Sequence, residues 1–157
     1  MLSRRNIRVK VMQTLYTLDS MNGEAKPGEP LAILTKKIEQ SRRLFLYLVY
    51  FITEIARYAE TDAGKKAGKH LPTAADLATS IKISGNEILW TILEDESFKR
   101  SVNDITAEHL MDKDLLKKMY CKLIETPEYI EYTEGQSRTK KTENKILEFI
   151  FPDLLLP

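Results

Sequence analysis

The chain has 157 residues, of which 43% are hydrophobic and 30% charged, and 24 Lys and Arg against 23 Asp and Glu leave a formal net charge of +1. This composition is typical of one folded globular domain and excludes a disordered chain. The longest apolar run, residues 44 to 52, is too short to span a bilayer, which takes about 20 residues. The only cysteine, Cys121, cannot form an intramolecular disulfide, and no signal-peptide pattern opens the chain. We therefore expect a cytoplasmic protein without a membrane contact.

The first predicted element is a helix that begins after Ser3, a candidate N-cap. Its apolar residues recur at the spacing of one helix face, which is expected to point into the core. These residues are Ile7, Val11, Leu15 and Leu18. Residues 21 to 30 contain two Gly and two Pro and are predicted to form a loop.

A long central helix is predicted from Leu31 to about Asp62, a stretch without Gly or Pro. Its middle is apolar on all sides, so it should be the most buried element. The residues expected in the core there are Tyr47, Val49, Phe51 and Ile55.

The remaining elements are recognised by capping patterns. Thr73 caps a short helix, and the spacing of Ser84 and Glu87 predicts a capping box that opens a helix from about Gly85 to Glu94. Further helices are expected after Asp112, after Thr126 and over KKTENKILEFIF, and a short strand near residues 129–132 is the one alternative. The sequence thus predicts an all-α fold, a compact bundle of about six helices with a long central helix, as a single domain over residues 1–157.

No catalytic residue, metal site or cofactor is predicted. Glycine-rich phosphate-binding loops are absent, and His70 and His109 lie in unrelated segments, where surface positions are expected. Cys121 and Trp90 both lie in apolar-periodic helices, and we expect them in the core.

The first helix also carries the candidate binding residues. Arg4, Arg5, Arg8 and Lys10 all precede the first acidic residue, Asp19. Positive charge at a helix N-terminus opposes the macrodipole by about 0.3–1 kcal/mol per residue, so stability alone would favour Asp or Glu there. The block indicates either a solvated helix end or a phosphate-binding surface, and the residues alone leave both open. A second basic cluster, at residues 36–43, is interpreted as a solvated face. A third, in a predicted loop at residues 64–70, either contacts backbone phosphate or has no ligand, and the residues leave both open.

The segment SRRNIRVKVMQTLYTLD resembles the opening helix of the NusB family of transcription antitermination factors. The family pattern is a run of arginines, a further Arg after a short gap, and a Gln-x-Leu-Tyr ending. The resemblance implies an all-helical protein that regulates transcription and binds boxA-type single-stranded RNA together with ribosomal protein NusE. The RNA-binding residues would be Arg4, Arg5, Arg8, Lys10, Gln13 and Tyr16, although Tyr16 could instead lie in the core.

This motif covers about a tenth of the chain. KKAGKHLPTA followed by NEILWTILEDES is similar to the N-terminal portion of a longer branch of the family. Two C-terminal segments typical of the family, of the form P-x-K-V-x-I-N-E and F-V-N-G-V-L-D, do not occur in this sequence. The NusE contact surface lies largely in that half, so the resemblance does not extend to the NusE site.

The chain ends on an apolar segment, in which Pro152 interrupts the helix pattern. Its large apolar residues are Phe149, Ile150, Phe151, Leu154, Leu155 and Leu156. Either these residues dock onto the core, or the chain continues in the intact protein. We expect some of them to be exposed and to support self-association. The alternative function is therefore a helical protein-interaction module without a nucleic-acid role, which uses residues 149–156 as its contact.

Overall fold

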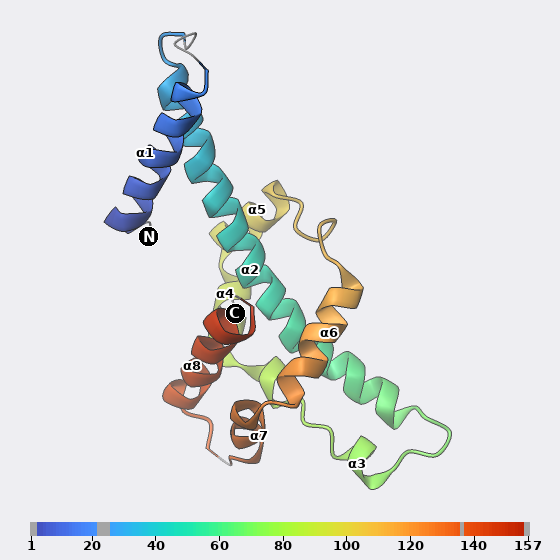
Figure 1. Cartoon of the computed structure of the whole chain (residues 1–157). Coiled ribbons are helices and arrows are strands. Elements are labelled where there is room, and N and C mark those ends of the chain that lie inside the picture. Colours follow the sequence, from blue (N-terminus) through green and yellow to red (C-terminus); the bar gives the residue numbers. More distant parts are fainter. Residues whose placement is uncertain (1–2, 22–25, 136, 156–157) are drawn as a thin grey trace. The chain divides into compact units, whose positions relative to one another are not determined.

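In the computed structural model of the chain, the described residues 3–21, 26–135 and 137–155 are helical or irregular, with no strand among them (Figure 1). The all-α prediction is confirmed, and residues 129–132 lie in a helix. The helices are α1 (Arg4–Asp19), α2 (Glu29–Ala67), α3 (Ala74–Leu77), α4 (Glu87–Glu94), α5 (Glu96–Asp104), α6 (Lys113–Ile124), α7 (Pro127–Glu134) and α8 (Lys140–Phe149). A 3-10 turn, η1 (Lys82–Gly85), precedes α4, and a π-helical turn, η2 (Ile150–Leu154), follows α8.

The chain divides into two compact units, Met1–Phe45 and Leu46–Pro157. The first unit holds α1 and the first part of α2, which lie side by side as a helical hairpin (Figure 1). Of the predicted loop at residues 21 to 30, residues 22–25 lie outside the described part of the chain. The second unit holds the rest of α2 and all later elements.

The long central helix is confirmed, and it extends beyond the predicted end at Asp62 to Ala67. Lys65 and Lys66 lie in its last turn, where positive charge interacts favourably with the helix dipole. Nζ of Lys66 also lies 2.7 Å from Oδ2 of Asp62, one turn earlier. These interactions explain why the helix continues through Gly64, which on its own disfavours a helix.

The core lies in the second unit and is built around the middle of α2. Phe51 and Ile55 are buried as expected, whereas Tyr47 and Val49 are only half-buried. The buried apolar residues that pack with them come from η1, α4, α6, α7, α8 and η2. These residues include Ile83, Leu89, Leu116, Tyr120, Leu123, Tyr129, Tyr132, Ile146, Ile150 and Leu154.

The C-terminal apolar segment belongs to this core. Ile150 and Leu154 are buried, and Phe149, Phe151 and Leu155 pack against the core cluster, while Leu156 lies outside the described residues. The expectation of an exposed patch here is wrong for the described residues. Around Pro152 the chain forms a π-helical turn, in which the Leu155 N–H donates to the Ile150 carbonyl at 3.1 Å. This wider turn accommodates the proline and still directs both Ile150 and Leu154 into the core.

The capping predictions hold at four helix starts and fail at one. Ser3, Asp112 and Thr126 cap α1, α6 and α7 as expected, and Thr73 forms a capping box before α3. Helix α4, however, is capped by Asn86. Its side-chain oxygen accepts the N–H groups of Ile88 at 3.0 Å and Leu89 at 3.2 Å.

Ser84 lies in the preceding 3-10 turn, where its hydroxyl donates to the Ile81 carbonyl at 2.7 Å. The capping box predicted from Ser84 and Glu87 is therefore wrong, because Asn86 lies closer to the first N–H groups of the helix. Asn86 also donates its amide N–H to the backbone carbonyl of Glu143 at 3.2 Å, and the Glu143 carboxylate accepts the Glu87 N–H at 2.6 Å. Both side chains are buried, so they join the start of α4 to α8 inside the core.

Two residues expected in the core lie at the surface. Trp90 is 51% exposed, and its indole N–H donates to the Ser84 carbonyl at 2.9 Å. Cys121 is also exposed, on the outer side of α6. His70 and His109 are exposed, as predicted.

Candidate nucleic-acid interface

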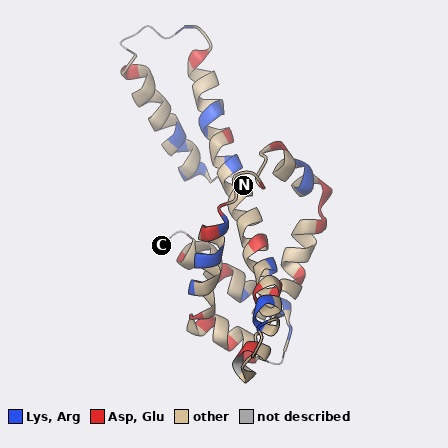
Figure 2. Ribbon diagram, turned by 90° about the vertical axis from the view of Figure 1, so that its right-hand side faces the viewer, with Lys and Arg blue, Asp and Glu red and all other residues tan. Residues whose placement is uncertain are grey.

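The candidate RNA-binding residues lie on α1, in the first unit. Figure 2 shows Lys and Arg in the N-terminal half of this helix, whose first turn contains no acidic residue. Ser3 fixes the start of the helix, because its Oγ accepts the N–H of Asn6 at 3.2 Å. Arg4 and Arg5 therefore follow immediately on the cap, in the first turn.

The arginine side chains are accessible to solvent. Arg4, Arg5 and Arg8 are exposed, and none of them forms an ion pair with an acidic side chain among the described residues. This differs from the second basic cluster, in which Arg42 contacts Glu39 at 3.1 Å. It also differs from the third, in which Lys69 contacts Asp76 at 2.6 Å. The charge of the α1 arginines is thus available to an anionic ligand.

The side of α1 that is buried is its polar side. Thr14 is the one buried residue among those described in α1, at 5% exposure, and Lys10 and Thr17 beside it are half-buried. The threonine hydroxyls donate to backbone carbonyls one turn earlier, each at 2.8 Å, Thr14 to Lys10 and Thr17 to Gln13. Because these hydroxyls are satisfied within the helix, the polar side can be covered at little cost.

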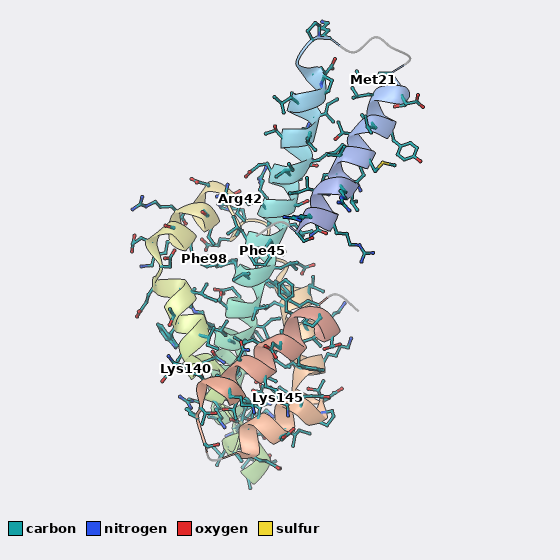
Figure 3. All side chains as sticks on the ribbon, turned by 90° about the vertical axis from the view of Figure 1, so that its left-hand side faces the viewer. Met21, Arg42, Phe45, Phe98, Lys140 and Lys145 are labelled. Atoms are coloured by element: carbon teal, nitrogen blue, oxygen red, sulfur yellow. The ribbon has the colours of Figure 1, made fainter. Side chains whose placement is uncertain are left out.

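The apolar side of α1 faces solvent instead. Ile7, Val11 and Leu15 are exposed and Leu18 is half-buried, so the predicted core face of this helix is wrong. Val9, Met12 and Tyr16 are exposed as well, and Tyr16 is 70% exposed. Figure 3 shows side chains that project from α1 on the side away from α2. The core alternative for Tyr16 is therefore excluded within the described residues.

Not all the predicted residues share one face. At about 100° per residue, Arg4, Arg5 and Arg8 fall within about a quarter of the helix circumference, and Tyr16 lies on the same side further along. Gln13 is exposed at the edge of this side, whereas Lys10 lies on the half-buried side near Thr14. The face therefore combines three cations with one aromatic ring, and Lys10 is outside it.

An open apolar groove continues this face towards the end of the helix. It has a volume of about 420 Å³ and is lined by Met12, Leu15, Tyr16 and Asp19. The sequence-based prediction did not place Met12, Leu15 or Asp19 among the binding residues. One feature of the sequence could have indicated them. The apolar side of α1 is wider than one neighbouring helix covers, so some of its residues must stay exposed.

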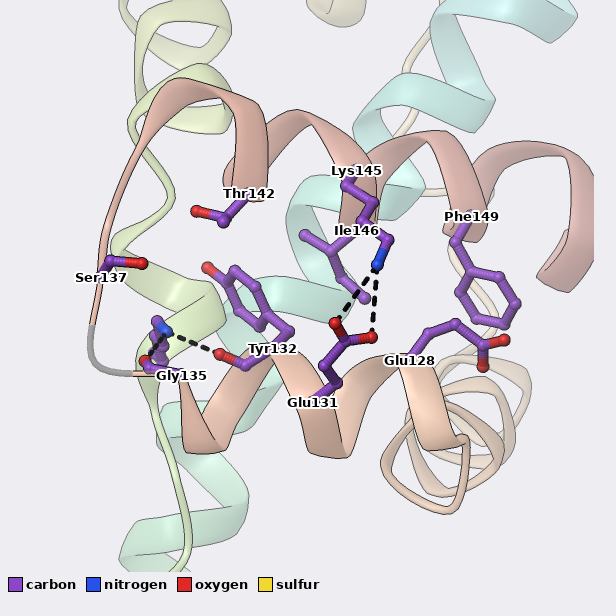
Figure 4. Close-up of a pocket in the computed structure, with 10 residues that line it drawn as sticks. Glu128, Glu131, Tyr132, Gly135, Ser137, Thr142, Lys145, Ile146 and Phe149 are labelled. Atoms are coloured by element: carbon purple, nitrogen blue, oxygen red, sulfur yellow. Dashed lines mark hydrogen bonds and ion pairs between the residues drawn. The ribbon is translucent and has the colours of Figure 1, made fainter.

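A second cavity, of about 270 Å³, lies between α7 and α8 in the other unit (Figure 4). Nζ of Lys82 donates to the carbonyls of Tyr132, at 2.6 Å, and Gly135, and lies over the Tyr132 ring. Nζ of Lys145 pairs with the Glu131 carboxylate at 3.2 Å. Because both lysines that line this cavity are bound to groups of the protein itself, its polar contacts serve the fold.

The described residues contain no group of three His, Cys, Asp or Glu side chains that could hold a metal ion. None of the described helices is both long enough and apolar enough to cross a bilayer. Fold and surface define an all-α protein in which the described part of α1 begins with exposed arginines. No protein-family model, curated protein or solved structure matches the chain.

Proposed function

We propose that the chain binds single-stranded RNA through α1 and acts as a NusB-like transcription antitermination factor that recognises boxA-type RNA. The observation that carries the proposal is the exposure of Arg4, Arg5 and Arg8 without an acidic partner among the described residues. These cations lie at a helix end where they oppose the dipole. A local choice that lowers stability at three positions is explained by a ligand that uses the charge.

In this proposal the arginines contact phosphates, which supplies affinity but no base preference. Tyr16 is far enough into solvent to stack on an unpaired base, and Gln13 beside it can hydrogen-bond a base edge. Arg8 and Tyr16 are about 12 Å apart along the helix axis, at 1.5 Å per residue. The strand would thus run along the outward face of α1.

The antitermination role and the boxA target rest on the resemblance of SRRNIRVKVMQTLYTLD to the NusB family. NusE is a partner of that family, but the segments that carry most of its contact surface do not occur in this sequence. RNA is therefore the partner to test first.

The test is a titration of fluorescent boxA-type single-stranded RNA at several salt concentrations, read by anisotropy. The variant is Arg4→Ala/Arg5→Ala/Arg8→Ala. We expect weaker binding and a log–log salt slope that is flatter by about 0.7 for each RNA phosphate that an arginine no longer neutralises. The fold should be kept or slightly stabilised, because the unfavourable interaction with the helix dipole is removed.

The matched control is Lys117→Ala/Lys118→Ala/Lys122→Ala, which also removes three positive charges, but from exposed positions of α6. It should leave the salt slope close to that of the unchanged chain. If both variants lose equal affinity, the binding is non-specific attraction to charge, and the role of α1 is disproved. Circular dichroism of both variants shows whether the fold is intact.

A further inference from the structure

We propose that the outward face of α1 is a self-association surface, which pairs antiparallel with the same face of a second copy of the chain. This inference goes beyond RNA binding and does not depend on it. It starts from the inverted burial of α1, whose polar side around Thr14 is covered while its apolar side is in water. A contiguous apolar face in solvent marks a contact surface.

The spacing along this face is that of a helix–helix seam. Arg8, Met12, Leu15 and Asp19 follow one another at intervals of four, three and four residues, as at the seam positions of a coiled coil. At about 100° per residue all four fall within about 60° of the helix circumference. Three of them, Met12, Leu15 and Asp19, line the open groove.

The order of residues in this seam makes it complementary to itself. In an antiparallel pair, each step forward on one helix is a step backward on the other. With the twofold axis between residues 13 and 14, Met12 of one copy lies opposite Leu15 of the other. The same register places Arg8 opposite Asp19, and it does so twice, once at each end.

The residues beside the seam fit this register too. Val11 and Tyr16 lie on opposite sides of the seam. In the antiparallel pair each side meets its own copy, so Val11 lies near Val11 of the other copy and Tyr16 near Tyr16, which adds an apolar contact on one side and an aromatic contact on the other. A parallel pair would instead place Arg8 against Arg8 and Asp19 against Asp19. Neither Arg8 nor Asp19 has an ion-pair partner in the described part of its own chain. Charge complementarity therefore selects a second copy in the antiparallel direction.

The seam is short, so the dimer is weak and forms at high protein concentration. It also shares Arg8 with the proposed RNA surface. A strand of RNA on α1 and a second copy on α1 exclude one another, and RNA shifts the protein towards the monomer.

The experiment is sedimentation equilibrium of the full chain over a wide concentration range. Asp19→Arg places like charges opposite one another at both ends and should raise the dissociation constant of the dimer about tenfold or more. Arg8→Asp should do the same. The exchange Arg8→Asp/Asp19→Arg restores opposite charges and should return the constant to within about threefold of the original.

The control is Asp104→Arg, the same charge change at an exposed position of α5, which should leave the association unchanged. Leu15→Glu tests the apolar layer and should abolish the dimer, and since Leu15 is exposed the fold should be kept. A monomer at every concentration overturns the proposal. So does a charge exchange that fails to restore the dimer, or an Asp19→Arg chain that associates like the Asp104→Arg chain.

The two proposals fail in different ways. Asp19→Arg changes no residue assigned to RNA, so it should separate the copies and keep RNA binding. If the unchanged chain forms the dimer but does not bind RNA, only the proposed function is contradicted. A dimer that persists at saturating RNA would show that the two partners use different surfaces, and it would overturn the α1 seam if RNA binding still requires Arg8.

Discussion

At the scale of single residues, the core of the second unit contains buried tyrosine side chains whose hydroxyls are shielded from water. Two of them are Tyr120 and Tyr129. Burial raises the pKa of Tyr129 from its ordinary value of 10.0 to about 12. Burial also raises the pKa of Tyr120, and the nearby Tyr129 and Asp62 add to the increase. Both side chains are therefore neutral in the folded protein well into the alkaline range.

The stability of the protein should depend on these hydroxyls at high pH. Because the folded pKa is above the unfolded one, the unfolded chain loses these protons first. Their contribution to the free energy of unfolding is complete below about pH 10 and is lost as the pH rises towards 12. The free energy of unfolding, measured with urea at several pH values in this range, should fall more steeply with pH for the unchanged chain than for Tyr120→Phe/Tyr129→Phe. The exposed Tyr16→Phe serves as control, and equal slopes for all three proteins would contradict the assignment.

Single side chains are also where sequence reasoning is least accurate. The helical periodicity of its neighbours predicts Trp90 in the core, yet its indole N–H bonds the Ser84 carbonyl and about half of the side chain stays in water. Cys121 lies between two buried positions, Tyr120 and Leu123, but points outward. Periodicity identifies an apolar helix, but it does not say which residue at the border of its apolar side is covered.

At the scale of helices, the starts are predictable where one cap residue has no competitor. Asp112 and Thr126 act within three residues of themselves, so the local sequence contains all the information. At α4 two polar residues compete, and the choice depends on Glu143, which is far away in the sequence. Element boundaries that depend on such distant contacts are not readable from local patterns.

This competition gives a prediction. Asn86→Ala removes the acceptor for two N–H groups of α4 and the donor to the Glu143 carbonyl, and two of these three hydrogen bonds are buried. We expect a loss of about 1–3 kcal/mol in the free energy of unfolding, measured by chemical denaturation. Ser84→Ala, which removes the cap that the local sequence suggests, should change it by less than about 0.5 kcal/mol. A larger effect at Ser84 than at Asn86 would reverse the assignment of the cap.

The candidate site is predictable only in part at this scale. The arginine block and Tyr16 can be found from the sequence, and the exposure of these residues is compatible with that interpretation. The side of α1 that is buried cannot be found from the sequence. The apolar side of α1 is wider than one neighbouring helix can cover, so the neighbour can pack at either edge of it. The edge next to Thr14 and Thr17 can be covered because the hydroxyls of these residues form hydrogen bonds within the helix.

At the scale of the whole molecule, buried apolar residues are unevenly distributed along the chain. Among the described residues, the buried core cluster begins at Phe51, and the partly buried apolar residues that pack against it begin at Tyr47. In the first unit, Met1–Phe45, the described residues include one buried side chain, Thr14, which is polar. A hairpin of this size without an apolar core has little stability of its own. Its helices are held by backbone hydrogen bonds and by half-buried side chains such as Leu18, Ile33 and Leu34.

Amide hydrogen exchange should therefore separate the two parts of the chain. Local opening costs little where it exposes little buried apolar surface, so amides of α1 should exchange at much lower free energies than those of residues 51–59, which contain the buried part of α2. Conditions that occupy the outward face of α1 should raise the protection of α1 selectively. Saturation with RNA tests the proposed function in this way, and high protein concentration tests the seam, since Asp19→Arg should cancel only the second effect. Equal protection of α1 and residues 51–59 in the dilute, RNA-free chain would show that the first unit is stabilised by contacts other than those described.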